Sequence, residues 1–288
     1  MPLLAGKNII GVNMAGTDPQ KAPTTHRFLD EVGDTTFFGK GKRSVIGEEG
    51  VSLAFGMGIV RIDRPLGEVR EEIENLHRSV EADRLLNTIP SVTKRVQKGG
   101  FFFHACKDSP EVRAVFLRYL EKLPCEAEIV MARKTPTLFA KKHHGNEDEF
   151  YADLLSHLIK GRLKKEQKLV LNVAHRGSST RAKVLEEALG KATHRALGKW
   201  EQGDLKTEVV FNVQTPLTEP LLCVADYLCW SVQRVFERGE VRHYDYLREK
   251  IRLVVDLYDR EKYQGSRNYY DNKRNPLTSE NKLGPPTT

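Results

Sequence analysis

Cysteine is scarce in this sequence, and long apolar runs are missing. Its four cysteines are well separated, so no CxxC pair supplies the spacing of a structural zinc site. Isolated thiols in apolar segments are typical of a reducing compartment. No run reaches the roughly 18 apolar residues of a membrane-spanning helix, and the first residues lack the pattern of a secretory signal. We therefore expect a cytoplasmic protein with no membrane role.

Catalytic motifs with a recognised signature are also missing. The sequence has no GxxxxGK[ST] phosphate loop, no GxGxxG fingerprint, no GxSxG elbow and no HExxH helix. These absences argue against P-loop, dinucleotide-binding, serine-hydrolase and zinc-peptidase chemistry. Gly56 and Gly58 lie within a strand pattern and lack a third glycine, so we interpret them as a β-bulge.

Charged residues are abundant instead. They make up 30% of the 288 residues, hydrophobic residues make up 39%, and the formal net charge is +7. This balance is typical of a globular protein with a sizeable core. The positive excess favours attraction to polyanions through phosphate contacts, although many basic proteins bind no nucleic acid.

The apolar pattern predicts an α/β fold, a mixed central sheet with helices on its faces. Because strand and helix patterns alternate in the later part of the chain, layered packing is expected there. Expected strands are residues 27–30, 36–39, 51–62, 101–106, 126–133, 168–175 and 208–214, the first three suggesting an antiparallel meander. Expected helices are residues 63–87, 108–123, 150–163, 179–196, 217–237 and 244–258, and residues 134–149 read as a basic, polar interval.

We divide the chain into three parts. Residues 1–25 form an N-terminal extension with at most a short strand at 8–12, and residues 26–260 form one α/β domain. A helical insertion is expected near 64–98. Residues 261–288 are polar and turn-rich, which predicts a flexible basic tail.

Two acids almost two hundred residues apart each stand at the edge of an apolar run. Asp30 follows a short strand, and Asp226 lies on a helix face with Glu219, Cys223 and Trp230. A carboxylate beside buried residues is costly to keep ionised unless a cation, a donor or water compensates it. A shared magnesium ion is one interpretation, since this ion accepts one or two carboxylates and keeps several waters. The alternatives are an Asx-type turn at Asp30 and an arginine pair or cap at Asp226.

Basic residues and histidines supply further candidates. His104 ends an apolar run, where it is either a hydrogen-bonded core residue or a catalytic base. Solvated surface is the alternative role for every lysine and arginine that we consider as a phosphate contact. These candidates are Lys40, Lys42 and Arg43 after the first acidic segment, Arg133, Lys134, Lys141 and Lys142 in the middle of the chain, and Arg176 after a strand.

The acidic segments also carry a family resemblance. Residues 30–34 resemble the "DESG" opening, and residues 222–230 resemble the "LQxADyxaw" helix, of the bacterial family called domain of unknown function thirty-eight-hundred. Phe103-His104-Ala105 before a charged helix is similar as well. The resemblance covers about residues 26–260, and the paired order of the motifs is more specific than either motif alone.

That family resembles the ribonuclease H-like superfamily, in which acids from the first strand and a late helix hold divalent metals for phosphoryl transfer. The resemblance implies a ribonuclease H-like fold and a nuclease that uses Mg²⁺ or Mn²⁺. It implies Asp30 and Asp226 as leading metal ligands and catalytic residues, with Glu31 next.

Two departures from the family pattern affect this prediction. Cys223 replaces the usual glutamine, and residues 168–175 supply Asn172, Ala174 and a histidine where a third acid is expected. Glu219 or Asp34 could compensate. Three functions stay open: a metal-dependent nuclease, a weak or inactive member that binds nucleic acid or a partner protein, and a metal-dependent phosphohydrolase of a small nucleotide.

Overall fold

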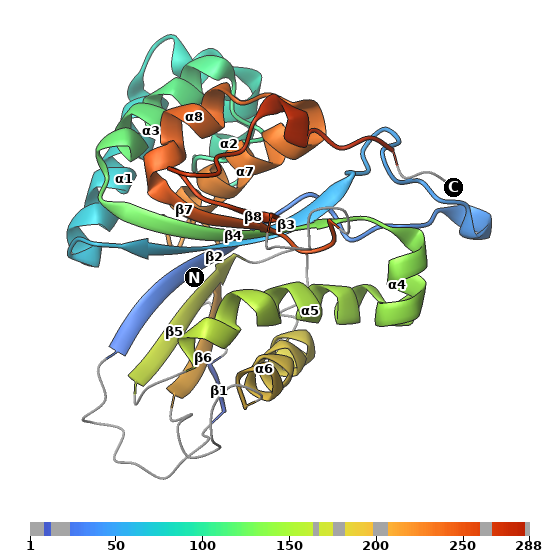
Figure 1. The fold of residues 1–288 in the computed structure, drawn as a ribbon. Helices are drawn as coiled ribbons and strands as arrows, with labels where there is room; N and C mark the ends of the chain where they lie inside the picture. Colours follow the sequence, from blue (N-terminus) through green and yellow to red (C-terminus); the bar gives the residue numbers. More distant parts are fainter. Residues whose placement is uncertain are drawn as a thin grey trace.

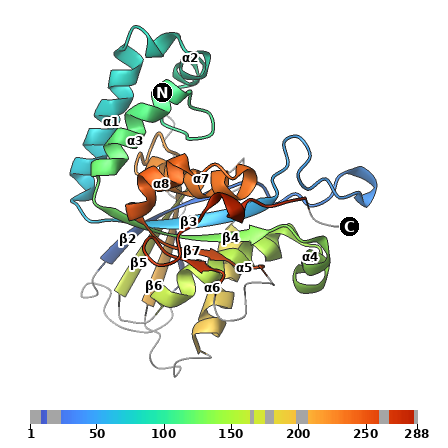
Figure 2. The same cartoon turned by 45° about the horizontal axis from the view of Figure 1, so that its top comes forward.

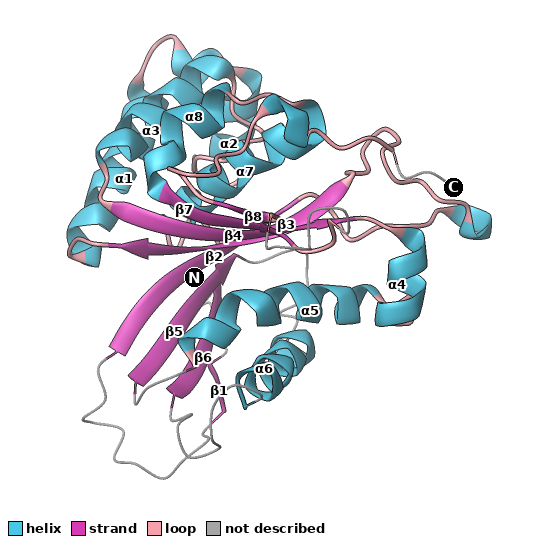
Figure 3. Cartoon of the chain, viewed as in Figure 1, coloured by secondary structure: helices cyan, strands magenta, loops and turns pink. Residues whose placement is uncertain are grey.

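One mixed sheet of eight strands organises the chain (Figures 1 and 3). The computed structural model describes residues 9–12, 24–163, 167–174, 182–197, 207–259 and 267–285. Over these residues the α/β prediction, with a mixed sheet and helices on its faces, is confirmed. The strands are β1 (Ile9–Val12), β2 (Thr24–Val32), β3 (Ala54–Ile62), β4 (Cys125–Arg133), β5 (Gln167–Ala174), β6 (Thr207–Gln214), β7 (Ile251–Asp256) and β8 (Tyr269–Tyr270).

The strand order is β1-β6-β5-β2-β3-β4-β7-β8. β2, β3 and β4 form an antiparallel meander, while β5 lies parallel to β2, β6 parallel to β5, and β7 parallel to β4. The short strands β1 and β8 pair antiparallel at the two edges. The β3 ladder is regular on both sides across Gly56 and Gly58, so the predicted bulge is wrong.

Helices cover both faces of this sheet (Figure 1). Within the described residues, no helix combines the length and the apolar character needed to cross a membrane. The helices are α1 (Leu66–Ala82), α2 (Pro90–Gln97), α3 (Pro110–Lys122), α4 (Pro136–His143), α5 (Glu147–Ile159), α6 (Ala182–Leu197), α7 (Leu222–Arg238) and α8 (Arg242–Leu247). Short 3-10 turns are η1 (Lys40–Lys42), η2 (Leu86–Thr88), η3 (Lys160–Arg162), η5 (Arg248–Lys250) and η7 (Ser279–Asn281).

The alternation of side chains along β2 assigns its residues to two cores. Phe28 and Val32 belong to the core that contains α7, whereas Leu29 belongs to the core that contains α5 and α6. Because successive strand residues point to opposite faces, Asp30 lies on the α7 face and Glu31 on the α5 face. This alternation places the two neighbouring acids on different sides of the sheet.

The chain segment that connects β3 to β4 forms a helical group, which packs on the α7 face of the sheet. Figure 2 shows α1, α2 and α3 standing together beside α7 and α8. α1 buries Val69, Ile73 and Val80, which recur at helical spacing. α3 starts as the sequence predicts, because the Ser109 hydroxyl accepts a hydrogen bond from Val112 N and proline occupies the first turn.

Two of the predicted early strands are loops. Phe101 and Phe103 are buried, but residues 101–106 pair with no described strand. The two rings pack against each other at a centroid distance of 5.1 Å, and the Phe103 ring stacks on Phe116 of α3 at 4.5 Å. Residues 36–39 contribute a single isolated bridge. Burial by helices therefore accounts for an apolar run that the pattern alone assigns to the sheet.

The predicted helix at 244–258 is wrong after its first residues. α8 ends at Leu247, and Ile251–Asp256 forms β7 on the open edge of β4. Its β-branched residues suit a strand, and pairing with β4 satisfies their backbone groups. In the opposite sense, the expected loop at 134–149 contains α4, which begins at Pro136 and buries Phe139.

Residues beyond the predicted domain are partly built into the fold. β1 pairs with β6, so part of the predicted N-terminal extension belongs to the sheet. Residues 267–285 pack against the body, where Tyr270, Leu277 and Leu283 are buried. This differs from the expected flexible tail, because β8 pairs with β7 and three apolar side chains leave solvent.

Candidate active site

Helix α7 lies directly on the central strands of the sheet. Gly58 of β3 pairs with Asp30 of β2, and a Cβ on Gly58 would lie 2.2 Å from the sulfur of Cys229 on α7. The Cys229 thiol in turn lies 3.8 Å from the backbone oxygen of Asp30, to which it donates. The missing side chain at Gly58 therefore permits close contact between α7 and β2.

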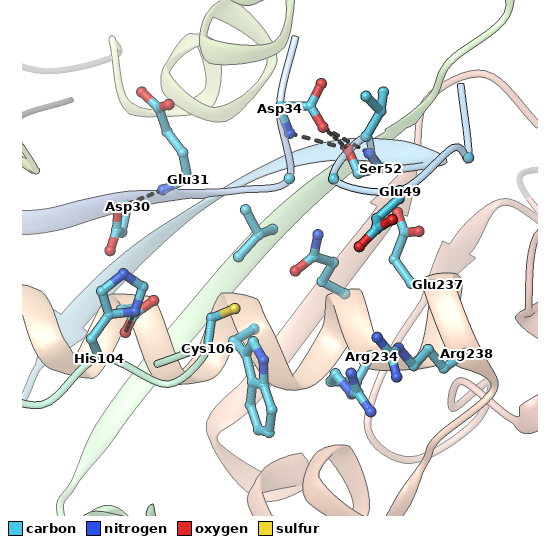
Figure 4. A pocket seen from close by; sticks show the side chains of 18 of the residues that line it. Asp30, Glu31, Asp34, Glu49, Ser52, His104, Cys106, Arg234, Glu237 and Arg238 are labelled. Carbon is cyan, nitrogen blue, oxygen red and sulfur yellow. Dashed lines mark hydrogen bonds and ion pairs between the residues drawn. The ribbon is translucent and has the colours of Figure 1, made fainter. Parts of the chain in front are cut away.

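A cavity of about 730 Å³ lies beside this contact (Figure 4). Its walls come from the end of β2, the loop at 47–52, the turn at 104–106 and one face of α7. We call it the acidic cavity, because carboxylates outnumber arginines along its walls. The charged groups that line it are Asp30, Glu31, Asp34, Glu48, Glu49, Asp226, Arg234, Glu237 and Arg238.

Asp30 faces the acidic cavity from the α7 side of β2. Its Oδ1 accepts a hydrogen bond of 2.7 Å from Glu31 N, and the residue is partly exposed. Figure 4 shows the Asp30 carboxylate pointing toward the ring of His104. β2 continues to Val32, so Asp30 lies two residues before the end of the strand rather than at its last residue.

Asp226 enters the same cavity from α7 and is 9% exposed. Its Oδ2 accepts a hydrogen bond of 2.7 Å from Ala105 N and lies 3.5 Å from Nδ1 of His104. Within the described part of the chain, no lysine or arginine forms an ion pair with Asp226, and no donor contacts Oδ1. The arginine-paired alternative is therefore wrong among these residues, and one carboxylate oxygen has no protein donor.

The two acids lie within electrostatic range of the same two thiols. Burial raises the pKa of Cys229 well above its usual range, and the charges of Asp30 and Asp226 raise it further. The pKa of Cys223 is raised by burial and by the same acids. Both thiols therefore stay protonated. Cys223 is fully buried, so it offers the acidic cavity no group comparable to the glutamine that it replaces.

His104 belongs to a turn that is held by several hydrogen bonds. Asp108 accepts donors from His104 N at 2.9 Å and from Arg95 Nη2 at 2.5 Å, and a third from the hydroxyl of Tyr227. Arg113 donates to Ala105 O at 3.0 Å and to Asp108 O at 2.6 Å. This network fixes the turn from both sides. The sequence does not reveal this network, because its members lie on three separate helices, α2, α3 and α7.

Glu31 and Asp34 also line the acidic cavity, but the other predicted acids do not join Asp30 and Asp226 in one group of carboxylates. Figure 4 shows Glu31 pointing away from Asp30 and His104, as expected for neighbouring strand residues. Glu219 is buried and receives three hydrogen bonds from Arg70. Asp34 binds Lys134 Nζ at 2.7 Å. Glu219 and Asp34 therefore do not compensate for a missing acid.

The middle strand carries no carboxylate at the cavity. Ala174 of β5 lines the acidic cavity, while Asn172 lies beside Phe28 and is satisfied by Arg27 O, Asn212 and Gln214. In the ranges that the structure describes, no three His, Cys, Asp or Glu side chains form a metal-binding group. A cation at this site would thus depend on few protein ligands.

The predicted phosphate contacts lie elsewhere. Lys40, Lys42 and Arg43 are exposed in and beside η1, outside the walls of the acidic cavity, and Arg43 pairs with Glu48 through two hydrogen bonds. Arg176 lies outside the described residues. Of the mid-chain candidates, Arg133 binds Asp256 and Asp259, Lys134 binds Asp34, and Lys142 binds Asp153.

Arginines on α7 occupy the position that the loop cations were expected to fill. Arg234 and Arg238 line the acidic cavity on the same helix face as Asp226. Arg234 and Arg238 follow Trp230 by four and eight residues, and this helical spacing could have predicted from the sequence that they share its side of the helix. Arg234 pairs with Glu240, and Arg238 is exposed.

The donor set suits a hard divalent cation. Asp30 and Asp226 supply carboxylate oxygens, and among the described residues no donor reaches Oδ1 of Asp226. Magnesium accepts such a small set when water completes its shell. Comparison with known proteins adds no further ligand, since no protein-family model matches the chain and no curated protein matches it. The family resemblance therefore stays a prediction, and the functional argument depends on the geometry.

Proposed function

We propose that this protein is a divalent-metal-dependent hydrolase of nucleic-acid phosphodiesters with a ribonuclease H-like fold. One observation carries the proposal: Asp30 from a central strand and Asp226 from a late helix line the same cavity. The family resemblance implies the same arrangement of strand and helix acids. Free thiols favour the cytoplasm as its compartment.

Asp30 and Asp226 would hold Mg²⁺ or Mn²⁺ between β2 and α7. Such an ion neutralises charge on the phosphodiester and on the leaving oxygen, and makes an attacking water more acidic. The carboxylate of Asp226 reaches this position already oriented, because Ala105 N donates to its Oδ2. Only Oδ1 is then left for a further ligand.

His104 is suited to accept a proton from the attacking water. Its Nδ1 is buried 3.5 Å from Asp226 Oδ2, while the side chain as a whole is 29% exposed. The second ring nitrogen is therefore the one that serves the cavity. The hydrogen bond from His104 N to Asp108 holds the backbone in place, which favours a constant ring position.

Arg234 and Arg238 would bind the phosphates next to the scissile bond. Arg234 lies 5.8 Å from the centre of the Trp230 ring, and Arg238 is exposed one turn further along α7. Guanidinium groups suit phosphate oxygens because their donors form a planar fork. The acidic walls would repel a polyanion without a bound cation, so binding should require metal.

A weak or inactive member that binds nucleic acid or protein is a second candidate. Ala174 beside the cavity and the direction of Glu31 favour it, because neither residue adds a third carboxylate next to Asp30 and Asp226. Hydrolysis of a small nucleotide is a third. A cavity of about 730 Å³ falls within the range of small-molecule sites.

A substrate panel with Mg²⁺ and with Mn²⁺ tests these candidates. Wild type, Asp30→Asn and Asp226→Asn are compared on single-stranded and duplex DNA, RNA and mononucleotides, with folding checked by circular dichroism. Glu49→Gln is the control, since Glu49 is an exposed acid of the same cavity. We expect the two aspartate variants to lose about a hundredfold or more in rate, and the control to keep it.

The remaining outcomes separate the candidates. Hydrolysis of mononucleotides alone supports the small-nucleotide function. Binding of oligonucleotides without hydrolysis supports the inactive member. Full cleavage by folded Asp226→Asn contradicts the proposed site.

A further inference from the structure

A second polar groove lies on the opposite face of the sheet. It has a volume of about 590 Å³ and is formed where β2, β3, β4 and β7 meet η3, the turn that follows α5. We call it the arginine groove, after the guanidinium groups that line it. Its charged residues are Arg27, Arg61, Arg162, Arg252, Glu126 and Glu128.

The arginine groove is separate from the acidic cavity. Arg27 precedes Asp30 by three residues on β2, so its side chain lies on the α5 face while Asp30 lies on the α7 face. No residue lines both the groove and the cavity. A ligand in the groove would not touch Asp226 or His104.

The carboxylates of the groove are already shared between arginines. Arg162 binds Glu128 at 2.9 Å, and Arg252 binds both Glu126, at 3.0 Å, and Glu128. Arg61 is 4.0 Å from Glu126 and also pairs with Asp63 outside the groove. Four guanidinium groups therefore share Glu126 and Glu128 in the groove and Asp63 beside it, which leaves one positive charge in excess.

Arg27 carries much of this excess. Its Nη1 donates to the backbone oxygen of His26 at 2.8 Å, and no carboxylate in the described ranges lies within ion-pair distance. Burial lowers the pKa of Arg27, and the charges of Arg162 and Arg61 lower it further. Burial also lowers the pKa of Arg162 to about 10. Arg27 has therefore lost water without gaining a carboxylate partner among the described residues.

We infer that the arginine groove binds a phosphate group. A phosphate group would compensate the unmatched positive charge, and its oxygens accept hydrogen bonds from several guanidinium forks at once. A carboxylate ligand carries one charge and two acceptor oxygens, so it serves several guanidinium groups less well than phosphate does. The volume leaves room for a phosphorylated small molecule or for part of a nucleic-acid backbone.

Binding is measured in EDTA, so that a metal at the acidic cavity does not contribute. The probes are inorganic pyrophosphate, followed by calorimetry, and a short fluorescein-labelled RNA, followed by anisotropy. Arg27→Met and Arg252→Met are compared with Arg78→Met, an exposed arginine of α1. Arg252 is 55% exposed, so its variant should fold even if Arg27→Met does not.

We expect wild type to bind at least one probe, and each groove variant to bind it about tenfold more weakly. Arg78→Met should bind as wild type does. Pyrophosphate binding that depends on the groove identifies a small phosphorylated ligand, and RNA binding alone identifies backbone phosphates. The inference is overturned if wild type binds neither probe, or if folded groove variants bind as tightly as wild type. Both results are independent of hydrolysis.

Discussion

Gly58 on β3 and Cys229 on α7 are in such close contact that a Cβ on the glycine would lie 2.2 Å from the sulfur. Gly58 is also the register partner of Asp30. The contact sets how near α7 comes to the sheet, and thereby how near Asp226 comes to the strand that carries Asp30. One small residue outside the cavity thus determines whether the two acids share it.

Gly58→Ala should destabilise the fold by about 1 to 3 kcal/mol, because the added methyl group overfills a closed contact. Urea unfolding measures the change. Gly67→Ala is the control, since a Cβ there meets nothing within 4 Å and the residue lies in a helix. Adding Cys229→Ala should recover part of the loss, since it removes the sulfur from the contact. Equal stability of Gly58→Ala and wild type would show that α7 is not held at this distance.

Arg113→Met should lower the rate of hydrolysis more than it changes KM, if the proposed function is correct. Arg113 holds Ala105 O and Asp108 O, so its loss loosens the turn that presents His104 and Ala105 N. Two hydrogen bonds to a charged group also predict about 1 to 3 kcal/mol of lost stability.

The matched control for this variant is Arg118→Met, an exposed arginine on the same helix. Arg113→Lys should recover part of the rate, because one donor is kept. An unchanged rate in Arg113→Met, with the stability loss present, would reduce Arg113 to a purely structural role.

Asp34→Asn should lower activity because it destabilises the fold, and not because it removes a metal ligand. Lys134 has a fully buried side chain and donates to Asp34 Oδ1 at 2.7 Å. Although burial alone would raise it, hydrogen bonds from Lys134 and Ser52 hold the pKa of Asp34 below its usual range. Neutralising Asp34 leaves the buried charge of Lys134 without its partner, which typically lowers the free energy of unfolding by about 3 to 5 kcal/mol.

Thermal and urea unfolding of Asp34→Asn measure this loss, with Glu49→Gln as an exposed acidic control from the same cavity. A stable Asp34→Asn protein that has lost only its activity would instead return Asp34 to the list of metal ligands.

His77 should make the fold sensitive to acid. Burial first, then the charges of Arg95 and Arg78, lower its pKa from 6.5 to about 4. Between these values the unfolded chain binds a proton that the folded chain does not, so stability falls as pH falls from 6.5 toward 4. His77→Leu should remove up to about 3 kcal/mol of this loss.

Urea unfolding at several pH values measures the effect of His77→Leu. Its Nε2 is buried without a hydrogen-bond partner, so leucine removes no bond at neutral pH. His194→Gln, at an exposed histidine of α6, is the control. The same slope in His77→Leu and wild type would assign the acid sensitivity to other groups.

Local signals located most of the elements. Ser109 and Pro110 mark the start of α3, and the apolar runs of β4, β5 and β6 lie within one or two residues of the predicted strands. These elements are fixed by neighbours along the chain. The same patterns misassigned residues 101–106 and 244–258, because a short apolar run satisfies either a sheet or a helical layer.

The candidate site was only partly predictable. The strand period alone separates Asp30 from Glu31, and the helical period alone places Arg234 about two turns from Asp226 on the same side of α7, so both results were within reach of the sequence. The partners of Glu219 and Asp34 were not, since Arg70 and Lys134 are distant in the chain.

The sequence by itself determined the alternation of strands and helices, the apolar faces and the identity of the two acids. The tertiary structure decided which acids line the cavity and which form ion pairs with distant basic residues. It also decided that α7 packs on β2 and β3. The division has a physical reason. Backbone periodicity depends on neighbouring residues, whereas charge pairing and helix docking depend on residues that only folding brings together.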